Sequence, residues 1–130
     1  MGLLTLSLAS CKNDGRKPTF AVSGKVLFNG KPAEHATVVF HPIGESGPDS
    51  VRPRGKVRAD GSFALTTYDG EDGAPAGDYR VTVELWLTTG RGDEGPTSRL
   101  PAKYARPETS GLTATVNAWP TELKPFDVRR

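Results

Sequence analysis

The feature that most constrains this chain is an alternation of apolar and polar residues in short segments that turn residues separate. One face of an extended chain carries Phe20, Val22, Gly24, Val26 and Phe28, and the other carries Ser23, Lys25 and Asn29. Strands repeat every two residues, whereas helices repeat every 3.6. The 15 Gly and 11 Pro residues point the same way, because both destabilise helices. The pattern therefore predicts an all-β fold.

Seven segments follow this alternation. Asn29-Gly30 follows the first segment, and Asp60-Gly61 joins the third to the fourth as a hairpin, because Asn, Asp and Gly suit tight turns. Short strands at fairly regular spacing are typical of an antiparallel sandwich or a small barrel. The expected strands are residues 20–28, 36–41, 54–59, 62–67, 78–87, 112–117 and 122–128.

The inward positions of these strands predict the core. A chain of 130 residues buries enough surface for a modest core without disulfides or metals. Each large apolar side chain that it buries contributes roughly 1.5–3 kcal/mol. We expect the Tyr79 ring to join this core and its hydroxyl to fix the preceding loop, residues 68–77. The expected core is Val22, Val26, Phe28, Val38, Phe40, Val57, Phe63, Leu65, Tyr79, Val81, Val83, Leu112, Val116 and Phe126.

The first residues differ from the rest of the chain. Residues 1–10 are mostly apolar or small, and Leu8-Ala9-Ser10-Cys11 resembles a bacterial lipobox, which implies cleavage before Cys11 and a lipid on its thiol. The positively charged start of a complete export signal is missing. We expect an export-signal remnant over residues 1–10, a polar tether over 11–19 and a β-domain over 20–130. The alternative is a frayed end with a free Cys11 thiol.

An ordered set of short segments carries a family resemblance over about residues 20–128. The segments include Asn29-Gly30-Lys31-Pro32, Ala59-Asp60-Gly61-Ser62-Phe63, Ala76-Gly77-Asp78-Tyr79-Arg80 and Leu100-Pro101-Ala102-Lys103-Tyr104. The chain resembles bacterial carboxypeptidase-regulatory-like, transthyretin-like domains, which occur in small exported lipoproteins. The resemblance implies a seven-stranded antiparallel Greek-key sandwich of the transthyretin-like (prealbumin-like) type, with no catalytic role and no cofactor.

Composition argues against several classes of protein. The 17 basic and 15 acidic residues leave a net charge of +2, which gives no indication of a nucleic-acid partner. The single Cys excludes an internal disulfide and Cys-based metal clusters. His35 and His41 are the only imidazoles, and we expect both to be solvated, so no metal site is predicted. No apolar run reaches the length of a membrane-spanning helix.

Two tryptophans are the candidates for a ligand surface. Trp86 shares the polar face of its strand with Arg80, Thr82 and Glu84, and Trp119 precedes Pro120 in a tight connection. An exposed indole can stack on a sugar ring. The alternative is that Trp86 covers a sheet edge or packs beneath the 88–101 loop.

Two other motifs have simpler explanations. The acidic residues Asp69, Glu71, Asp72 and Asp78 are close enough in sequence to suggest calcium, but their spacing does not match the twelve-residue calcium loop. We favour the interpretation that these four acidic residues are solvated residues of a turn. Arg91-Gly92-Asp93 spells an adhesion tripeptide, but three residues recur by chance.

The sequence favours a non-enzymatic lipoprotein, exported and anchored to the bacterial cell envelope through a lipid on Cys11. Its sandwich would bind an envelope polysaccharide or protein, or have a structural role. A carbohydrate-binding module is the first alternative, favoured if Trp86 is exposed. A transthyretin-like hydrolase acting on 5-hydroxyisourate is disfavoured, because the chain ends in Phe126-Asp127-Val128-Arg129-Arg130 and lacks that family's Tyr-Arg-Gly-Ser tail.

Overall fold

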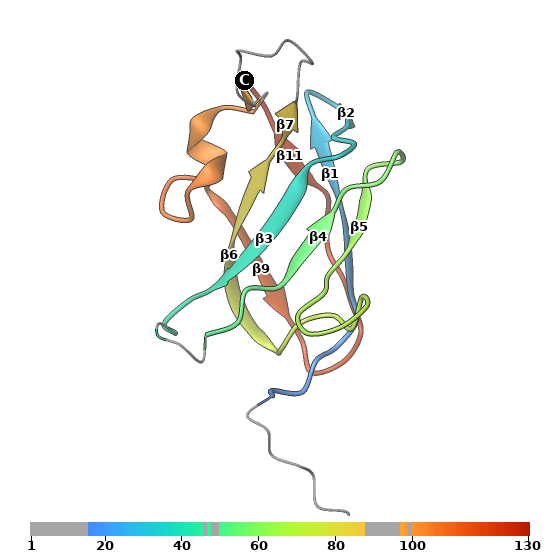
Figure 1. Ribbon diagram of the computed structural model, residues 1–130, viewed down its shortest axis with the longest axis vertical. Helices are drawn as coiled ribbons and strands as arrows, with labels where there is room; N and C mark the ends of the chain where they lie inside the picture. The colour runs from blue at the N-terminus through green and yellow to red at the C-terminus, as the bar shows by residue number, and fades with distance from the viewer. Residues whose placement is uncertain (1–15, 46, 48–49, 88–96, 99) are drawn as a thin grey trace, which may run out of the picture.

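The computed structural model describes residues 16–45, 47, 50–87, 97–98 and 100–130. These residues form an all-β sandwich in which two sheets face each other, with a single turn of 3-10 helix beside them (Figure 1). The predicted all-β class is therefore confirmed.

The first sheet is built around β1 (Val22–Phe28). On one side β1 pairs antiparallel with β5 (Ser62–Ala64) and with the short β2 (Lys31–Pro32). On the other side it pairs parallel with β10 (Thr121–Glu122) and β11 (Phe126–Val128).

The second sheet is wholly antiparallel, in the order β4, β3, β6 and β9. Its strands are β4 (Arg54–Lys56), β3 (Thr37–Pro42), β6 (Gly77–Glu84) and β9 (Leu112–Val116). The register places Val38 opposite Val83 and Phe40 opposite Val81, so the apolar residues of neighbouring strands share the inner face.

Three short elements lie outside these sheets. The predicted strand over residues 78–87 is interrupted at Leu85, and β7 (Trp86–Leu87) then pairs with β8 (Thr97–Ser98) as a separate ribbon. The helical turn η1 (Ala102–Ala105) leads towards β9 and buries Tyr104. The Tyr104 hydroxyl donates to the Arg129 carbonyl at 3.2 Å and accepts from the Arg129 N–H at 3.0 Å, which ties this turn to the C-terminal segment.

The prediction of a wholly antiparallel sandwich was wrong for the last segment. The β10 and β11 strands run parallel to β1, and the register between them shifts by one residue: Ser23 lies opposite Glu122, but Val26 lies opposite Phe126. Pro125 lies in the interruption and has no N–H to donate to a neighbouring strand. The predicted strand over 122–128 is therefore two short strands.

The predicted hairpin over residues 54–67 is present at its turn but does not form a ribbon within one sheet. At the turn, the Gly61 N–H donates to the Arg58 carbonyl at 2.9 Å, and the Arg58 N–H donates to the Ser62 carbonyl at 2.8 Å. The strands then part, because β4 pairs with β3 and β5 pairs with β1. Two backbone bonds between Arg54 and Thr66, of 3.0 and 2.8 Å, join the sheets again farther along.

The core lies between the two sheets. Every residue of the expected core is buried except Phe28 and Leu112, which pack against it while partly exposed. The Phe40 ring lies at its centre, with ring centroids of Tyr79, Phe63 and Phe126 at 5.6, 6.3 and 6.4 Å. Several further buried residues were not predicted: Ala33, Ala36, Ala74, Leu85, Leu100, Tyr104, Ala114 and Val128.

Tyr79 fixes the loop that precedes β6, as the sequence predicts. Its hydroxyl donates to the Pro75 carbonyl at 2.6 Å, and the side chain is buried. Burial disfavours the phenolate and, with the nearby Glu45 carboxylate, raises the pKa of Tyr79 to about 12.

We expect Tyr79 to make the protein less stable at alkaline pH. The unfolded chain releases the phenol proton near the ordinary pKa of 10.0, whereas the folded chain keeps it up to about 12. Stability from this group is complete below the lower pKa and is lost as the pH rises through this window. Tyr79→Phe removes this titration and leaves the Pro75 carbonyl unpaired, which costs about 1–3 kcal/mol at neutral pH. Urea unfolding across this range measures both effects.

Tyr68→Phe is the matched control, because the Tyr68 hydroxyl accepts only the Lys17 N–H among the described hydrogen bonds. The free energy of unfolding should fall less between neutral and alkaline pH in Tyr79→Phe than in the parent chain. If it fell by the same amount in both, the role assigned to Tyr79 would be wrong.

Candidate functional site

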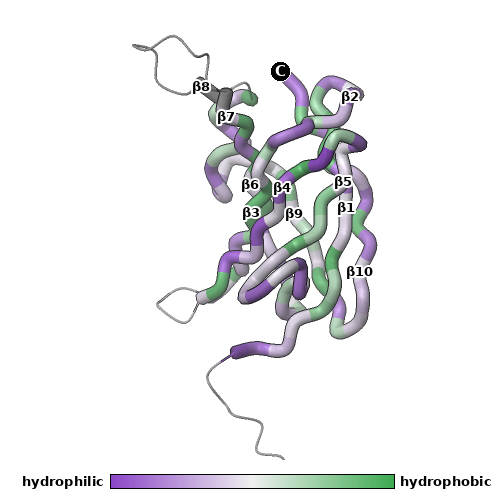
Figure 2. The backbone as a smooth tube through the Cα atoms, turned by 45° about the vertical axis from the view of Figure 1, so that its right-hand side comes forward, coloured by the Kyte–Doolittle hydropathy of each residue, from purple (hydrophilic) through white to green (hydrophobic). Residues whose placement is uncertain are grey.

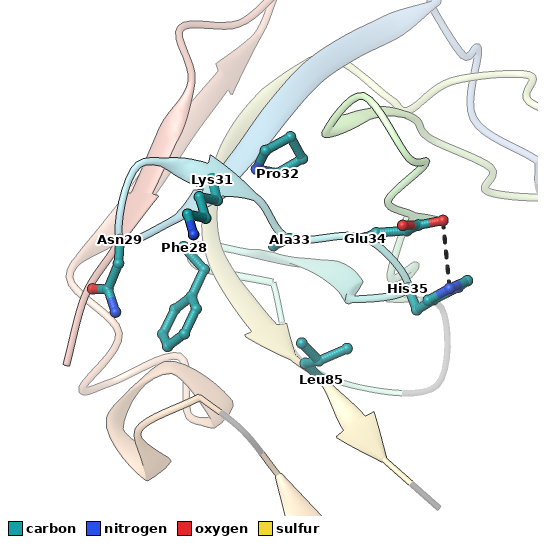
Figure 3. Close-up of a pocket in the computed structure, with 8 residues that line it drawn as sticks. All are labelled: Phe28, Asn29, Lys31, Pro32, Ala33, Glu34, His35 and Leu85. Atoms are coloured by element: carbon teal, nitrogen blue, oxygen red, sulfur yellow. Dashed lines mark ion pairs between the residues drawn. The ribbon is translucent and has the colours of Figure 1, made fainter.

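A hollow of about 490 Å³ opens at the end of the sandwich where β1 finishes. We call it the end pocket. Figure 3 shows the Phe28 ring and the Leu85 side chain projecting into the same space. Leu85 and Ala33 are buried and Phe28 is partly exposed, so the floor is apolar. The lining residues are Phe28, Asn29, Lys31, Pro32, Ala33, Glu34, His35 and Leu85.

A tight turn builds one wall of the end pocket. Asn29 and Gly30 have φ values of 50° and 83°, and they connect β1 to β2 with Phe28 opposite Lys31. Both central residues of a type I′ turn need positive φ, so the predicted turn at Asn29-Gly30 is confirmed. The Asn29 N–H donates to the Val128 carbonyl at 3.0 Å, which fixes the turn to β11.

The other wall contains a histidine in an unfavourable backbone conformation. His35 has a φ of 73°, in the left-handed region that only a few per cent of non-glycine residues adopt, Asn, Asp and His more often than the others. Its N–H donates to the Val57 carbonyl at 2.9 Å, and the next residue closes a turn with an Ala36 N–H to Ala33 carbonyl bond of 3.1 Å. Such strain often accompanies a binding site, because the surrounding structure must hold it.

The rim of the end pocket is polar and carries both signs of charge. The His35 Nε2 lies 3.5 Å from the Glu34 Oε1, and the two side chains are 71% and 49% exposed. An ion pair this exposed contributes little to stability. Lys31 and Asn29 add a cation and an amide. The lining therefore combines an apolar floor with side chains around it that can form hydrogen bonds.

A second hollow, of about 560 Å³, lies beside His41 and includes Arg52, Arg54 and Thr67 in its lining. The prediction that His41 is solvated was wrong. Its ring is partly buried, and its Nε2 lies 2.9 Å from the Thr82 Oγ1. Burial, together with the positive charge of Arg52, lowers the pKa of His41, and the Glu108 carboxylate opposes this shift. His35 is solvated, as expected.

The two candidate tryptophans are both exposed but lie at opposite ends of the sandwich. The Trp86 side chain is 53% exposed, and its Nε1–H donates to the Glu84 Oε2 at 2.6 Å. Trp119 is 62% exposed and lies in the connection between β9 and β10, at the far end of the molecule from β7 (Figure 1). The structure therefore does not bring them together as one surface.

The acidic residues of the 68–78 region do not converge on one point. Asp72 accepts from the N–H groups of Thr67, Tyr68 and Asp69 at 2.7, 3.1 and 3.2 Å. Partial burial acts to raise the pKa of Asp72, but these donors prevail and hold it below its ordinary value. Asp78 accepts from the Thr115 hydroxyl at 2.7 Å.

The other two acidic residues form ion pairs, Glu71 with Arg58 and Asp69 with Arg16. Within the described part of the chain, no three His, Cys, Asp or Glu side chains lie close enough together to hold a metal ion.

Two features singled out in the sequence lie outside the described residues: Cys11 and the Arg91-Gly92-Asp93 tripeptide. Among the described residues, no helix is both long and apolar enough to cross a bilayer.

Comparison with known proteins gives little further information. No family model matches the sequence, and no curated protein matches it. Among solved structures, the crystal structure of a 9R-lipoxygenase from Cyanothece PCC8801 matches with a TM-score of 0.44 and 17% identity, over 85% of this chain and 16% of the lipoxygenase. A likeness this weak carries no argument about activity.

The strained backbone at His35 gives a test of how the end pocket is built. A left-handed conformation costs an ordinary residue about 1–2 kcal/mol, a β-branched residue fits it poorly, and glycine adopts it freely. We therefore expect His35→Gly to be more stable than His35→Val by about 1–2 kcal/mol. Urea unfolding of the two variants measures the difference. Equal stabilities would contradict the conformation described for this wall.

Proposed function

We propose that this protein is an exported lipoprotein, anchored to the bacterial cell envelope by a lipid on Cys11, whose sandwich binds an envelope component without catalysis. The observation that carries the proposal is the separation of the two ends. The described chain begins at one end of the sandwich, and β2, whose residues line the end pocket, lies at the other (Figure 1). A lipid near the N-terminus would therefore leave the pocket free to meet a ligand.

We also propose that the domain is of the transthyretin-like, carboxypeptidase-regulatory-like type. Counting β10 and β11 as one interrupted strand, and setting aside the two-residue strands β2, β7 and β8, seven strands remain. They divide into three in the first sheet and four in the second, and the chain crosses between the sheets from β1 to β3, from β4 to β5, from β5 to β6 and from β9 to β10. This arrangement supports the family that the sequence segments suggest.

The chemistry of the end pocket supports the binding of a small ligand. An apolar floor of Phe28, Ala33 and Leu85 under a polar rim suits a small amphipathic group, such as part of a polysaccharide or of a peptide. The rim carries one basic side chain, Lys31, and one acidic side chain, Glu34, so it favours no strongly charged ligand. No nucleic acid and no cofactor form part of this proposal.

The lipid on Cys11 can be tested directly. We expect the chain, expressed with an export signal in a bacterium, to incorporate radioactive palmitate and to fractionate with membranes. Cys11→Ser should remove the label and release the protein into the soluble fraction, because no other thiol is present. Lys12→Ala is a control at the neighbouring position and should keep the label. An unlabelled, soluble parent chain would refute the anchor.

Carbohydrate binding through Trp86 is a second candidate, and the exposure of that side chain favours it. The bond to Glu84 fixes the indole on the surface, where one face can stack on a sugar ring. Because Trp119 lies elsewhere, Trp86 would have to act without it.

Intrinsic fluorescence tests this second candidate. In a Trp119→Phe variant, Trp86 is the sole tryptophan, and we expect a shift in its emission with one member of a panel of envelope polysaccharides. A Trp86→Phe variant, which reports Trp119, should show no such shift. A Trp86 emission spectrum that none of the polysaccharides changes rejects this candidate.

A further inference from the structure

The end of the sandwich at which the described chain begins is held by several contacts, and we call it the tether end. The Lys17 N–H donates to the Tyr68 hydroxyl at 3.0 Å, and the Lys17 Nζ lies 2.6 Å from the Glu45 Oε2. The Arg16 guanidinium lies 5.3 Å from the centre of the Tyr68 ring. The chain therefore leaves the domain from a fixed point rather than from a loose segment.

This fixed point limits how far Cys11 can lie from the domain. Cys11 lies five positions before Arg16 in the sequence, and an extended chain spans at most about 3.6 Å per position, or about 18 Å in all. A lipid on Cys11 would thus keep the tether end close to the bilayer surface.

Two of the three exposed large hydrophobic side chains of the described residues lie at this end. They are Ile43, 48% exposed, and Trp119; the third, Trp86, lies at the opposite end. The Ile43 N–H donates to the Asp78 carbonyl at 3.0 Å, and the neighbouring Gly77 pairs with Val116 just before the Trp119 connection. Both views place the beginning of the described chain, the end of β3 and the β9–β10 connection at the lower end (Figures 1 and 2).

Several acidic side chains at the tether end interact with groups of the domain itself. Four acidic side chains there have partners: Asp69 lies against Arg16, Glu45 lies against Lys17, Asp72 accepts hydrogen bonds from backbone N–H groups, and Asp78 accepts one from the Thr115 hydroxyl. Arg52, in the hollow next to Pro42, makes no ion pair with another described residue. Its guanidinium is complementary to the phosphate of a lipid headgroup.

We propose that the tether end lies against the phospholipid bilayer, with Trp119 and Ile43 at the boundary between headgroups and acyl chains and Arg52 facing the phosphates. This inference rests on the proposed lipid at Cys11. Tryptophan suits that boundary because its ring is apolar and its N–H is polar. Contacts that are weak individually are enough to hold this orientation, because the short tether keeps the tether end at an effective concentration in the mM range next to the bilayer. The end pocket then faces away from the membrane.

Fluorescence quenching by brominated lipids tests this orientation. The lipidated full-length chain is reconstituted into vesicles of phosphatidylcholine and phosphatidylglycerol with brominated acyl chains, as Trp86→Phe and as Trp119→Phe. Each variant then contains one tryptophan. We expect quenching of Trp119 to exceed quenching of Trp86 at least about twofold, because only Trp119 would reach the boundary.

The outcomes separate this inference from the proposal on which it rests. Protein that sediments with the vesicles but shows equal quenching of both tryptophans, or stronger quenching of Trp86, leaves the anchor intact and overturns the orientation. Protein that remains in the supernatant overturns the anchor, and the orientation with it.

A charge reversal at each end provides a matched pair of variants. Arg52→Glu, made in the Trp86→Phe background, should lower Trp119 quenching by about half, more so in vesicles rich in phosphatidylglycerol. Lys31→Glu makes the same change in charge at the end pocket and should leave the quenching unchanged. An equal effect of the two variants would contradict a specific contact of Arg52 with the lipid.

Discussion

The packing of four aromatic rings across the two sheets is the interaction on which the rest of this structure depends. Phe40 and Tyr79 come from the second sheet, and Phe63 and Phe126 come from the first; the Phe63 and Phe126 rings stack on each other at 6.3 Å. Buried aromatic pairs add to the free energy of burial when their rings meet edge to face or offset. Because Phe126 lies on the last strand, this cluster also holds the C-terminal segment against β1.

A close approach between backbones sets the geometry of the tether end. The Phe20 N–H donates to the Ala74 carbonyl and the Ala74 N–H donates to the Phe20 carbonyl, both at 2.9 Å. Gly73, with a φ of 96°, lies so close that a Cβ there would be 1.8 Å from the Phe20 oxygen. Only glycine allows the 65–74 loop to lie against the start of β1, so this one residue helps to place Tyr68 where it meets Lys17.

The sequence predicted what depends on local pattern and missed what depends on distant partners. Alternation identified the inward residues because a strand exposes and buries side chains in turn, and Asn29-Gly30 identified its turn because few residues tolerate positive φ there. Nothing local shows that β10 and β11 lie parallel to β1. Phe28 follows the same alternation as the core and gives no sign that it lines a pocket. His35 is not a typical turn residue, so its left-handed backbone had no signal either.

The direction of the last strand has a mechanical consequence. The described chain enters β1 at one end of the sandwich and leaves β11 at the other, and β1 and β11 are parallel neighbours (Figure 1). Tension between the two termini would pull these strands in opposite directions along their length. Their hydrogen bonds would then be loaded together in shear, rather than opened one after another like a zipper. A domain attached to a surface at one terminus and pulled at the other is thereby built to resist extension.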